Sequence, residues 1–144
     1  MTIKQLSVFI ENVPGRLAEI TQILGEHKID IRALSLADTT KFGILRLIVD
    51  NPDEAETSLK KAGLTVTLTK VIAIGIADKP GGLASAIGVL GQGDISIEYM
   101  YAFVSREHNT AYVIVRVDDN EKAIELLKAN NVTMLTPEEI YSNP

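Results

Sequence analysis

Two short segments of this chain read almost alike, and they define an internal duplication. Residues 12–18 read NVPGRLA and residues 78–84 read DKPGGLA, with Pro14 and Pro80 lying 66 residues apart. Each segment follows an apolar run with strand-like alternation and precedes apolar residues at helical spacing. The sequence therefore predicts two copies of one small unit, over residues 1–70 and 71–144.

The elements of the two halves follow the same order. In the first half we expect strands at 6–11, from Ile29 onward, 44–49 and 64–68, helices at 14–26 and 52–62, and a hairpin turn at 39–43. In the second half we expect strands at 71–77, 95–104, 110–117 and 132–135, and helices at 80–90 and 120–129. The second hairpin loop, at 105–109, is two residues longer than the first.

Each half is predicted to be a ferredoxin-like β-α-β-β-α-β unit in an α+β protein. Right-handed crossovers bring the four strands into one antiparallel sheet with both helices on one face. The second and fourth strands lie at the edges, and an open edge invites further pairing. We expect the second strands of the two halves to pair, so that the units pack side by side in one eight-stranded sheet.

Composition excludes several classes of function. The net charge is −5 and the basic residues are scattered singly, which argues against a nucleic-acid partner. With no cysteine, disulfides, thiolate metal sites and cysteine catalysis are excluded. The two histidines, His27 and His108, occupy non-equivalent places in the repeat, so we expect no metal site or cofactor. Without a leader or a membrane-spanning run, we expect a cytoplasmic protein.

With its Pro-Gly-x-Leu loop after Asn12 or Asp78, the following helix and the Ile-x-Ile strand, each half resembles an ACT domain. Residues 3–136 together resemble a tandem pair of ACT domains with no attached enzyme. The resemblance implies a non-catalytic regulatory module that binds an amino acid or a similar small metabolite between paired units. It implies allosteric control in amino-acid metabolism, with a second copy of the chain or a partner enzyme as protein partner.

The resemblance also implies which residues hold the ligand. They come from the Pro-Gly loop of one unit and from the start of the second strand of the other. One site consists of Asn12, Val13, Pro14, Gly15, Arg16 and Leu17, closed by Ser96 and Ile97. The other consists of Asp78, Lys79, Pro80, Gly81, Gly82 and Leu83, closed by Asp30 and Ile31. The two sites are unequal, and we expect Gly82 to leave more room than Arg16.

Simpler interpretations of these residues stay open at this point. Asn12 and Asp78 could only cap helices, since both residue types are favoured at that position. Gly15 and Gly81 could serve helix packing, and Arg16 could be a solvated cation. Rival functions are a protein-interaction adaptor without a ligand and a small enzyme on a ferredoxin-like scaffold. No nucleophile with a neighbouring base stands out in the sequence, which argues against the enzyme.

Overall fold

The protein is an α+β structure with an antiparallel sheet and two β-α-β-β-α-β units, as the sequence predicts. A computed structural model describes residues 1–38, 41–103 and 109–141. The N-terminal unit comprises Lys4–Thr69 with Ile140 and Tyr141, and the C-terminal unit comprises Met1–Ile3 with Lys70–Glu139. The predicted boundary at residue 70 stays a prediction.

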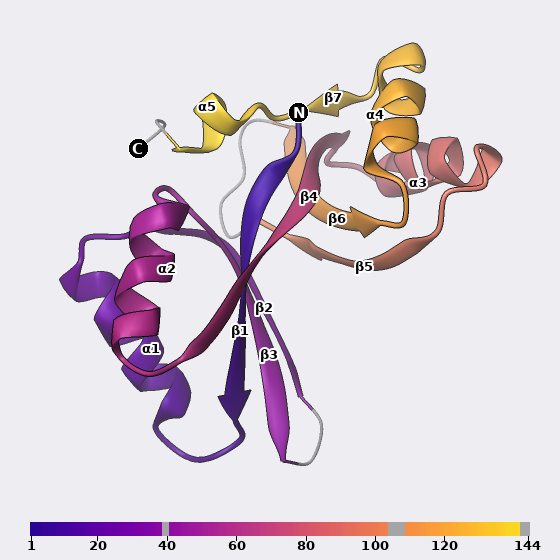
Figure 1. Ribbon diagram of the computed structural model, residues 1–144. Coiled ribbons are helices and arrows are strands. Elements are labelled where there is room, and N and C mark those ends of the chain that lie inside the picture. Colours follow the sequence, from indigo (N-terminus) through magenta and orange to yellow (C-terminus); the bar gives the residue numbers. More distant parts are fainter. Residues whose placement is uncertain (39–40, 104–108, 142–144) are drawn as a thin grey trace. The chain divides into compact units, whose positions relative to one another are not determined.

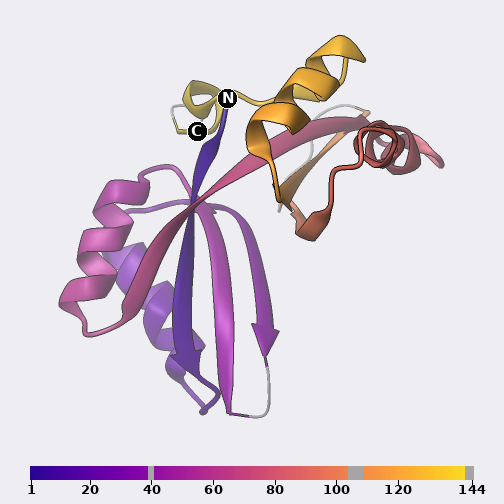
Figure 2. The same ribbon diagram turned by 45° about the vertical axis from the view of Figure 1, so that its right-hand side comes forward.

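The N-terminal unit has its two helices on one face of the sheet (Figures 1 and 2). Its elements are β1 (Ile3–Glu11), α1 (Arg16–Glu26), β2 (Ile31–Asp38), β3 (Phe42–Val49), α2 (Pro52–Lys61) and the first part of β4 (Thr65–Ala77). The strand order is β2-β3-β1-β4, so the second and fourth strands lie at the edges, as predicted.

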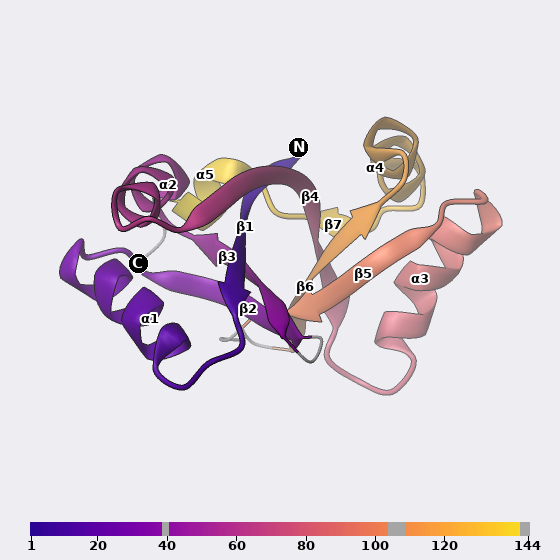
Figure 3. The ribbon, with the colours of Figure 1, turned by 60° about the horizontal axis from the view of Figure 1, so that its bottom comes forward.

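The C-terminal unit repeats this arrangement, with both helices on one side of its strands (Figure 3). Its elements are the second part of β4, α3 (Gly82–Gln92), β5 (Ile97–Ala102), β6 (Thr110–Val117), α4 (Asn120–Ala129) and β7 (Thr133–Met134). The strand order is β4-β6-β5, and β7 pairs with β4 on the opposite side.

One strand, β4, belongs to both units. The two strands predicted at 64–68 and 71–77 form this single strand of 13 residues, so the sheet has seven strands and not eight. The prediction of eight strands was wrong, because residues 69–71 contain no turn residue that would end one strand before the next begins. Within their own units β2 pairs with β3 and β5 pairs with β6. The predicted pairing of β2 with β5 stays a prediction.

Each unit has its own apolar core between helices and sheet, because alternate residues of each strand face the helices. In the N-terminal unit the buried set is Leu6, Val8, Ile10, Ile20, Leu24, Ile29, Leu45, Leu47, Val49, Ala55, Leu59 and Val66. In the C-terminal unit it is Ile72, Ile74, Ala86, Leu90, Ile95, Val113, Val115, Val117, Ala123, Leu127 and Met134.

The described part of the chain ends in a short helix, α5 (Pro137–Tyr141). The Glu139 N–H donates to Thr136 Oγ1 at 3.2 Å, and the Thr136 N–H donates to Glu139 Oε1 at 3.2 Å. This reciprocal pair is a capping box, which satisfies two backbone donors at a helix start. The buried Ile140 anchors the helix on the N-terminal unit.

Parts of both predicted hairpin loops, and His108, lie outside the described residues. Among the helices that the structure describes, none has the length and apolar character that crossing a bilayer requires.

The matching core positions Leu24 and Leu90 are both fully buried. We expect Leu24→Ala and Leu90→Ala each to lower the free energy of unfolding by about 2–5 kcal/mol, because each leaves a cavity. Leu36 is 48% exposed, so Leu36→Ala should change stability by only about 0.5 kcal/mol. Urea denaturation followed by circular dichroism checks this, and equal losses for Leu36→Ala and Leu90→Ala would contradict it.

Candidate functional site

The two Pro-Gly loops have the same backbone conformation. Gly15 and Gly81 both have φ 88° and ψ −12°, in the left-handed region, and each is the N-cap of the following helix, α1 or α3. The N–H of residues 16 and 82 donates to the carbonyl of Val13 or Lys79, at 3.3 and 3.0 Å. Glycine is required at this step because a Cβ disfavours a positive φ. Each loop thus leads the chain from a strand into a helix.

Neither of these two helices has a side-chain cap. Asn12 and Asp78 precede the N-cap by three residues, and no side chain makes a cap hydrogen bond at Gly15 or Gly81. The interpretation of Asn12 and Asp78 as helix caps was therefore wrong. By contrast, Asn51 Oδ1 accepts a hydrogen bond from the Glu54 N–H in α2, and Asp119 caps α4 in the same way. Only the Pro-Gly loops leave the first helical turn without a side-chain acceptor among the four long helices of the described chain.

The side chains of the loops are exposed on a fixed backbone. The Asn12 N–H donates to the carbonyl of Lys41 at 2.9 Å, and the Asp78 N–H donates to that of Asn109 at 2.8 Å. These bonds tie each loop to the residues before β3 or β6. Val13 and Leu83 are 46% and 40% exposed, which is high for apolar residues of their size. Asn12, Pro14, Asp78, Lys79 and Pro80 are exposed as well.

The predicted partners from the second strands are also equivalent in the two units. The Asp30 N–H donates to Asp50 Oδ1 at 2.9 Å, and the Ser96 N–H donates to Asp118 Oδ1 at 3.1 Å. Asp30 Oδ2 further pairs with Arg32 Nη1 at 2.7 Å. Ile31 and Ile97, the first residues of β2 and β5, pack against the core of their own unit.

Within one unit, the Pro-Gly loop and the start of the second strand lie at opposite ends of the sheet. Glu11, next to the loop, pairs with Phe42 at the start of β3, whereas Ile31 pairs with Val49 at its end. The same separation holds in the C-terminal unit, where Ala77 pairs with Thr110 and Ile97 with Val117. A site that uses both segments must therefore take them from two different units.

The two loops differ most at residues 16 and 82. Arg16 is half-buried, with Nη1 3.2 Å from Glu19 Oε2 and Nη2 4.0 Å from Glu11 Oε2. Gly82 is buried, and an added Cβ would overlap the carbonyl oxygen of Ala77. A side chain therefore does not fit at this position. The expectation that Gly82 leaves more room for a ligand than Arg16 stays a prediction.

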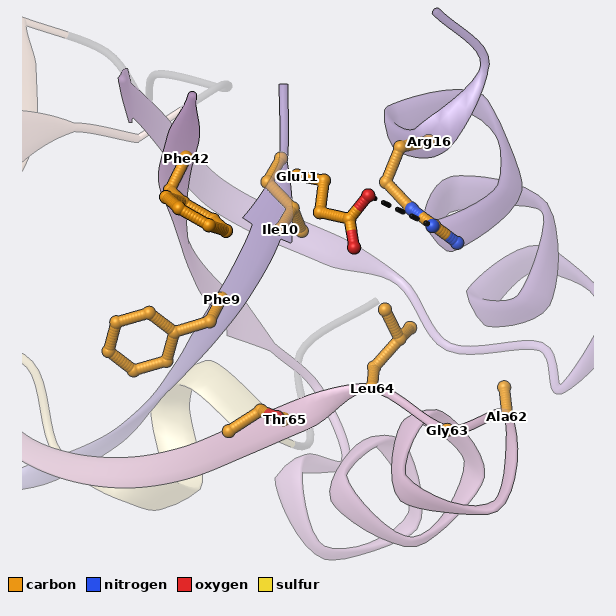
Figure 4. Close-up of a pocket in the computed structure, with 9 residues that line it drawn as sticks. All are labelled: Phe9, Ile10, Glu11, Arg16, Phe42, Ala62, Gly63, Leu64 and Thr65. Carbon is orange, nitrogen blue, oxygen red and sulfur yellow. Dashed lines mark ion pairs between the residues drawn. The ribbon is translucent and has the colours of Figure 1, made fainter. Parts of the chain in front are cut away.

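A cavity of about 250 Å³ lies beside the first loop, within the N-terminal unit (Figure 4). Its lining comes from the end of β1, the start of α1 and β3, and the turn from α2 into β4: Phe9, Ile10, Glu11, Arg16, Phe42, Ala62, Gly63, Leu64 and Thr65. Figure 4 shows the Glu11 carboxylate directed toward the Arg16 guanidinium, with Leu64 below them.

Of the predicted site residues, only Arg16 lines this cavity. The other lining residues were missed because they come from three separate parts of the chain: the end of β1, the start of β3 and the turn from α2 into β4. Gly63, with φ 89°, follows the end of α2. The sequence does place a charged residue, Glu11, and an aromatic residue, Phe42, beside loops. Only the register of β1 and β3 shows that these two residues are neighbours.

The sequence matches the ACT domain pair family over residues 1–142. The chain belongs to the ACT domain family. The β-α-β-β-α-β units and the duplicated Pro-Gly loops agree with this membership.

Solved structures with the same fold include protein BT0572 from Bacteroides thetaiotaomicron. It is 40% identical to this chain, with a TM-score of 0.92, over 98% of this chain and 96% of the other. The ligand-free regulatory subunit of aspartate kinase from Thermus thermophilus is 18% identical, with a TM-score of 0.66, over 89% and 90% of the two chains. The Thermus flavus subunit is 17% identical, with a TM-score of 0.60, over 88% and 90%. No match was found among curated proteins.

Within residues 1–38, 41–103 and 109–141, no group of three or more His, Asp or Glu side chains is placed to hold a metal ion.

The shared conformation of Gly15 and Gly81 predicts equal effects of substitution. We expect Gly15→Ala and Gly81→Ala each to lower the free energy of unfolding by about 1–2 kcal/mol, because alanine is strained at φ 88°. Gly25→Ala is the control, since Gly25 is helical with open space around it and should gain up to about 1 kcal/mol. Thermal unfolding measures all three, and a stabilising Gly81→Ala would contradict the assigned loop conformation.

The steric difference between the loops predicts that alanine substitution costs more stability at position 82 than at the equivalent position 16. We expect Gly82→Ala to cost about 1–3 kcal/mol, because the methyl group displaces the Ala77 carbonyl. Arg16→Ala removes only exposed ion pairs and should cost less than about 1 kcal/mol. Denaturant midpoints compare the two variants, and a reversed order would refute the steric explanation.

Proposed function

We propose that this ACT domain pair is a non-catalytic regulatory module that binds an amino acid or a similar small metabolite at its Pro-Gly loops. One observation carries the proposal: the two loops share one positive-φ glycine conformation and start the only two long helices of the described chain that lack a side-chain cap. A helix N-terminus of this kind attracts a carboxylate through its N–H groups and its dipole.

The proposed ligand contacts keep the residues expected from the sequence. The loop residues 12–17 or 78–83 hold the carboxylate and ammonium, and Ser96 with Ile97, or Asp30 with Ile31, completes the site from the second strand of another unit. Support comes from the in-unit separation of these segments, which requires two units for one site.

Ligand binding would act by population shift. A ligand that prefers one arrangement of paired units stabilises it in proportion to the difference in affinity. We propose that the readout is a partner enzyme or a second copy of the chain in amino-acid metabolism, in the cytoplasm. The aspartate kinase regulatory subunits offer a precedent for a chain of this fold that serves as a regulatory subunit.

A thermal-shift screen with the common L-amino acids at millimolar concentration tests the proposal. A ligand at 100-fold over Kd adds about 2.7 kcal/mol of stability. For a chain near this size, that corresponds to a rise in Tm of roughly 5–10 °C. The absence of a shift with every amino acid would refute the amino-acid sensor.

Asn12→Ala and Asp78→Ala then identify the loop that binds. The Tm of each variant without ligand is measured as well, so that a loss of stability is told apart from a loss of binding. We expect one or both to reduce the ligand-induced shift, and unchanged shifts in both would remove these side chains from the site.

A further inference from the structure

We propose that the cavity beside the first Pro-Gly loop holds an α-amino acid with an apolar side chain. This inference takes its ligand class from the proposed function, but the cavity lies within one unit and shares only Arg16 with the loop site, so it is a separate site for such a ligand. It concerns the N-terminal unit alone, since every lining residue belongs to that unit.

The charges at the cavity suit a zwitterion. Glu11 and Arg16 carry opposite charges, and their closest atoms are 4.0 Å apart. That distance is too long for a direct hydrogen bond, so neither group uses its hydrogen-bonding capacity on the other. A ligand carboxylate would bind the Arg16 guanidinium while its ammonium binds Glu11. An anion alone would face the Glu11 carboxylate, and a cation alone would face Arg16.

Two helix ends at the cavity also carry opposite partial charges, one positive and one negative, as the charge pair does. Arg16 is the first residue of α1, whose N-terminus carries partial positive charge. Ala62 and Gly63 follow the last turn of α2, whose C-terminus carries partial negative charge. A zwitterion lying between them gains from both ends, whereas a singly charged ligand gains from only one.

The remaining walls favour an apolar side chain. Ile10 is 7% exposed, and Leu64 packs partly against the core, so together they present an apolar floor. Phe9 and Phe42 are 50% and 59% exposed and leave apolar surface at the rim.

The charge pair does not recur at the matching positions of the second repeat. Phe9, Glu11, Arg16 and Phe42 correspond to Gly75, Ala77, Gly82 and Thr110. The apolar floor does recur, as Ile76 and Val132. The Tyr112 ring lies 3.2 Å from where a Cβ of Gly75 would be, and a Cβ at Gly82 would meet the Ala77 carbonyl. The two repeats thus share the loop but not the Glu11–Arg16 pair.

Isothermal titration of the full chain with L-leucine and a set of analogues tests the ligand class. Isopentylamine lacks the carboxylate, 4-methylpentanoate lacks the ammonium, and glycine lacks the side chain. We expect L-leucine or L-phenylalanine to bind at least about tenfold more tightly than each analogue, since a charge-assisted hydrogen bond contributes roughly that factor.

Two variants with matched controls test the position. Glu11→Gln should weaken amino-acid binding by roughly 10- to 100-fold, because the ammonium contact is lost. It should not weaken 4-methylpentanoate, which loses only the repulsion of the Glu11 carboxylate. Glu19→Gln, the control, breaks the other Arg16 ion pair outside the cavity and should change Kd by less than about fivefold. Ala62→Leu should fill the cavity and abolish binding, whereas Asn130→Leu, at the matching C-cap of α4, should not.

The outcomes separate this inference from the proposed function. Loss of binding in Glu11→Gln and Ala62→Leu, with binding kept in both controls, supports the cavity site. If an amino acid binds but its Kd is the same in Glu11→Gln and Ala62→Leu, the cavity site is wrong and the regulatory function stands. If glycine binds as tightly as L-leucine and L-phenylalanine, the apolar side-chain class is wrong. If no amino acid binds the unmodified chain, both proposals fail.

Discussion

The positive-φ glycine before the first helix of each unit is the constraint on which the rest of the structure depends. Gly15 and Gly81 end the short connections 12–15 and 78–81, so that the helix starts directly after them and returns over the sheet. That return places Ile20 and Leu24, or Ala86 and Leu90, on the strands they bury. Because the glycine is itself the N-cap, no side chain occupies the end of the helix. One backbone requirement therefore sets both the packing of the unit and the exposure of its N–H groups.

The repeat separates what the fold requires from what a ligand would require. Backbone features recur in both units: the glycine conformation, the N–H bonds to the preceding carbonyls, and the bond from residue 30 or 96 to the following aspartate. Side chains at the mouth of the loop do not recur, since Glu11 and Arg16 are replaced by Ala77 and Gly82. The charges at Glu11 and Arg16 are therefore not demanded by the shared fold, which is why we propose a binding role for them.

Much of the fold could be predicted from local pattern. The alternation at Leu6, Val8 and Ile10 and the helical spacing of Leu17, Ile20 and Leu24 identified strand and helix correctly, because each depends on residues near one another in the chain. The Thr136–Glu139 capping box was also present locally and was overlooked. The junction of two strands in β4 was predicted as a break, since the end of one repeat was taken as the end of a strand.

The sequence by itself determined the duplication, the β-α-β-β-α-β order, the family and the two glycine turns, since each is set by local spacing and by the steric demand of positive φ. Only the tertiary structure decided that Asn12 and Asp78 do not cap helices, that the backbone fills the space beside Gly82, and that a cavity lies between Glu11, Arg16 and Leu64. These features depend on register and helix placement, which bring together residues about fifty positions apart. No local pattern records those distances, so the sequence predicted the loops and the structure showed the cavity next to one of them.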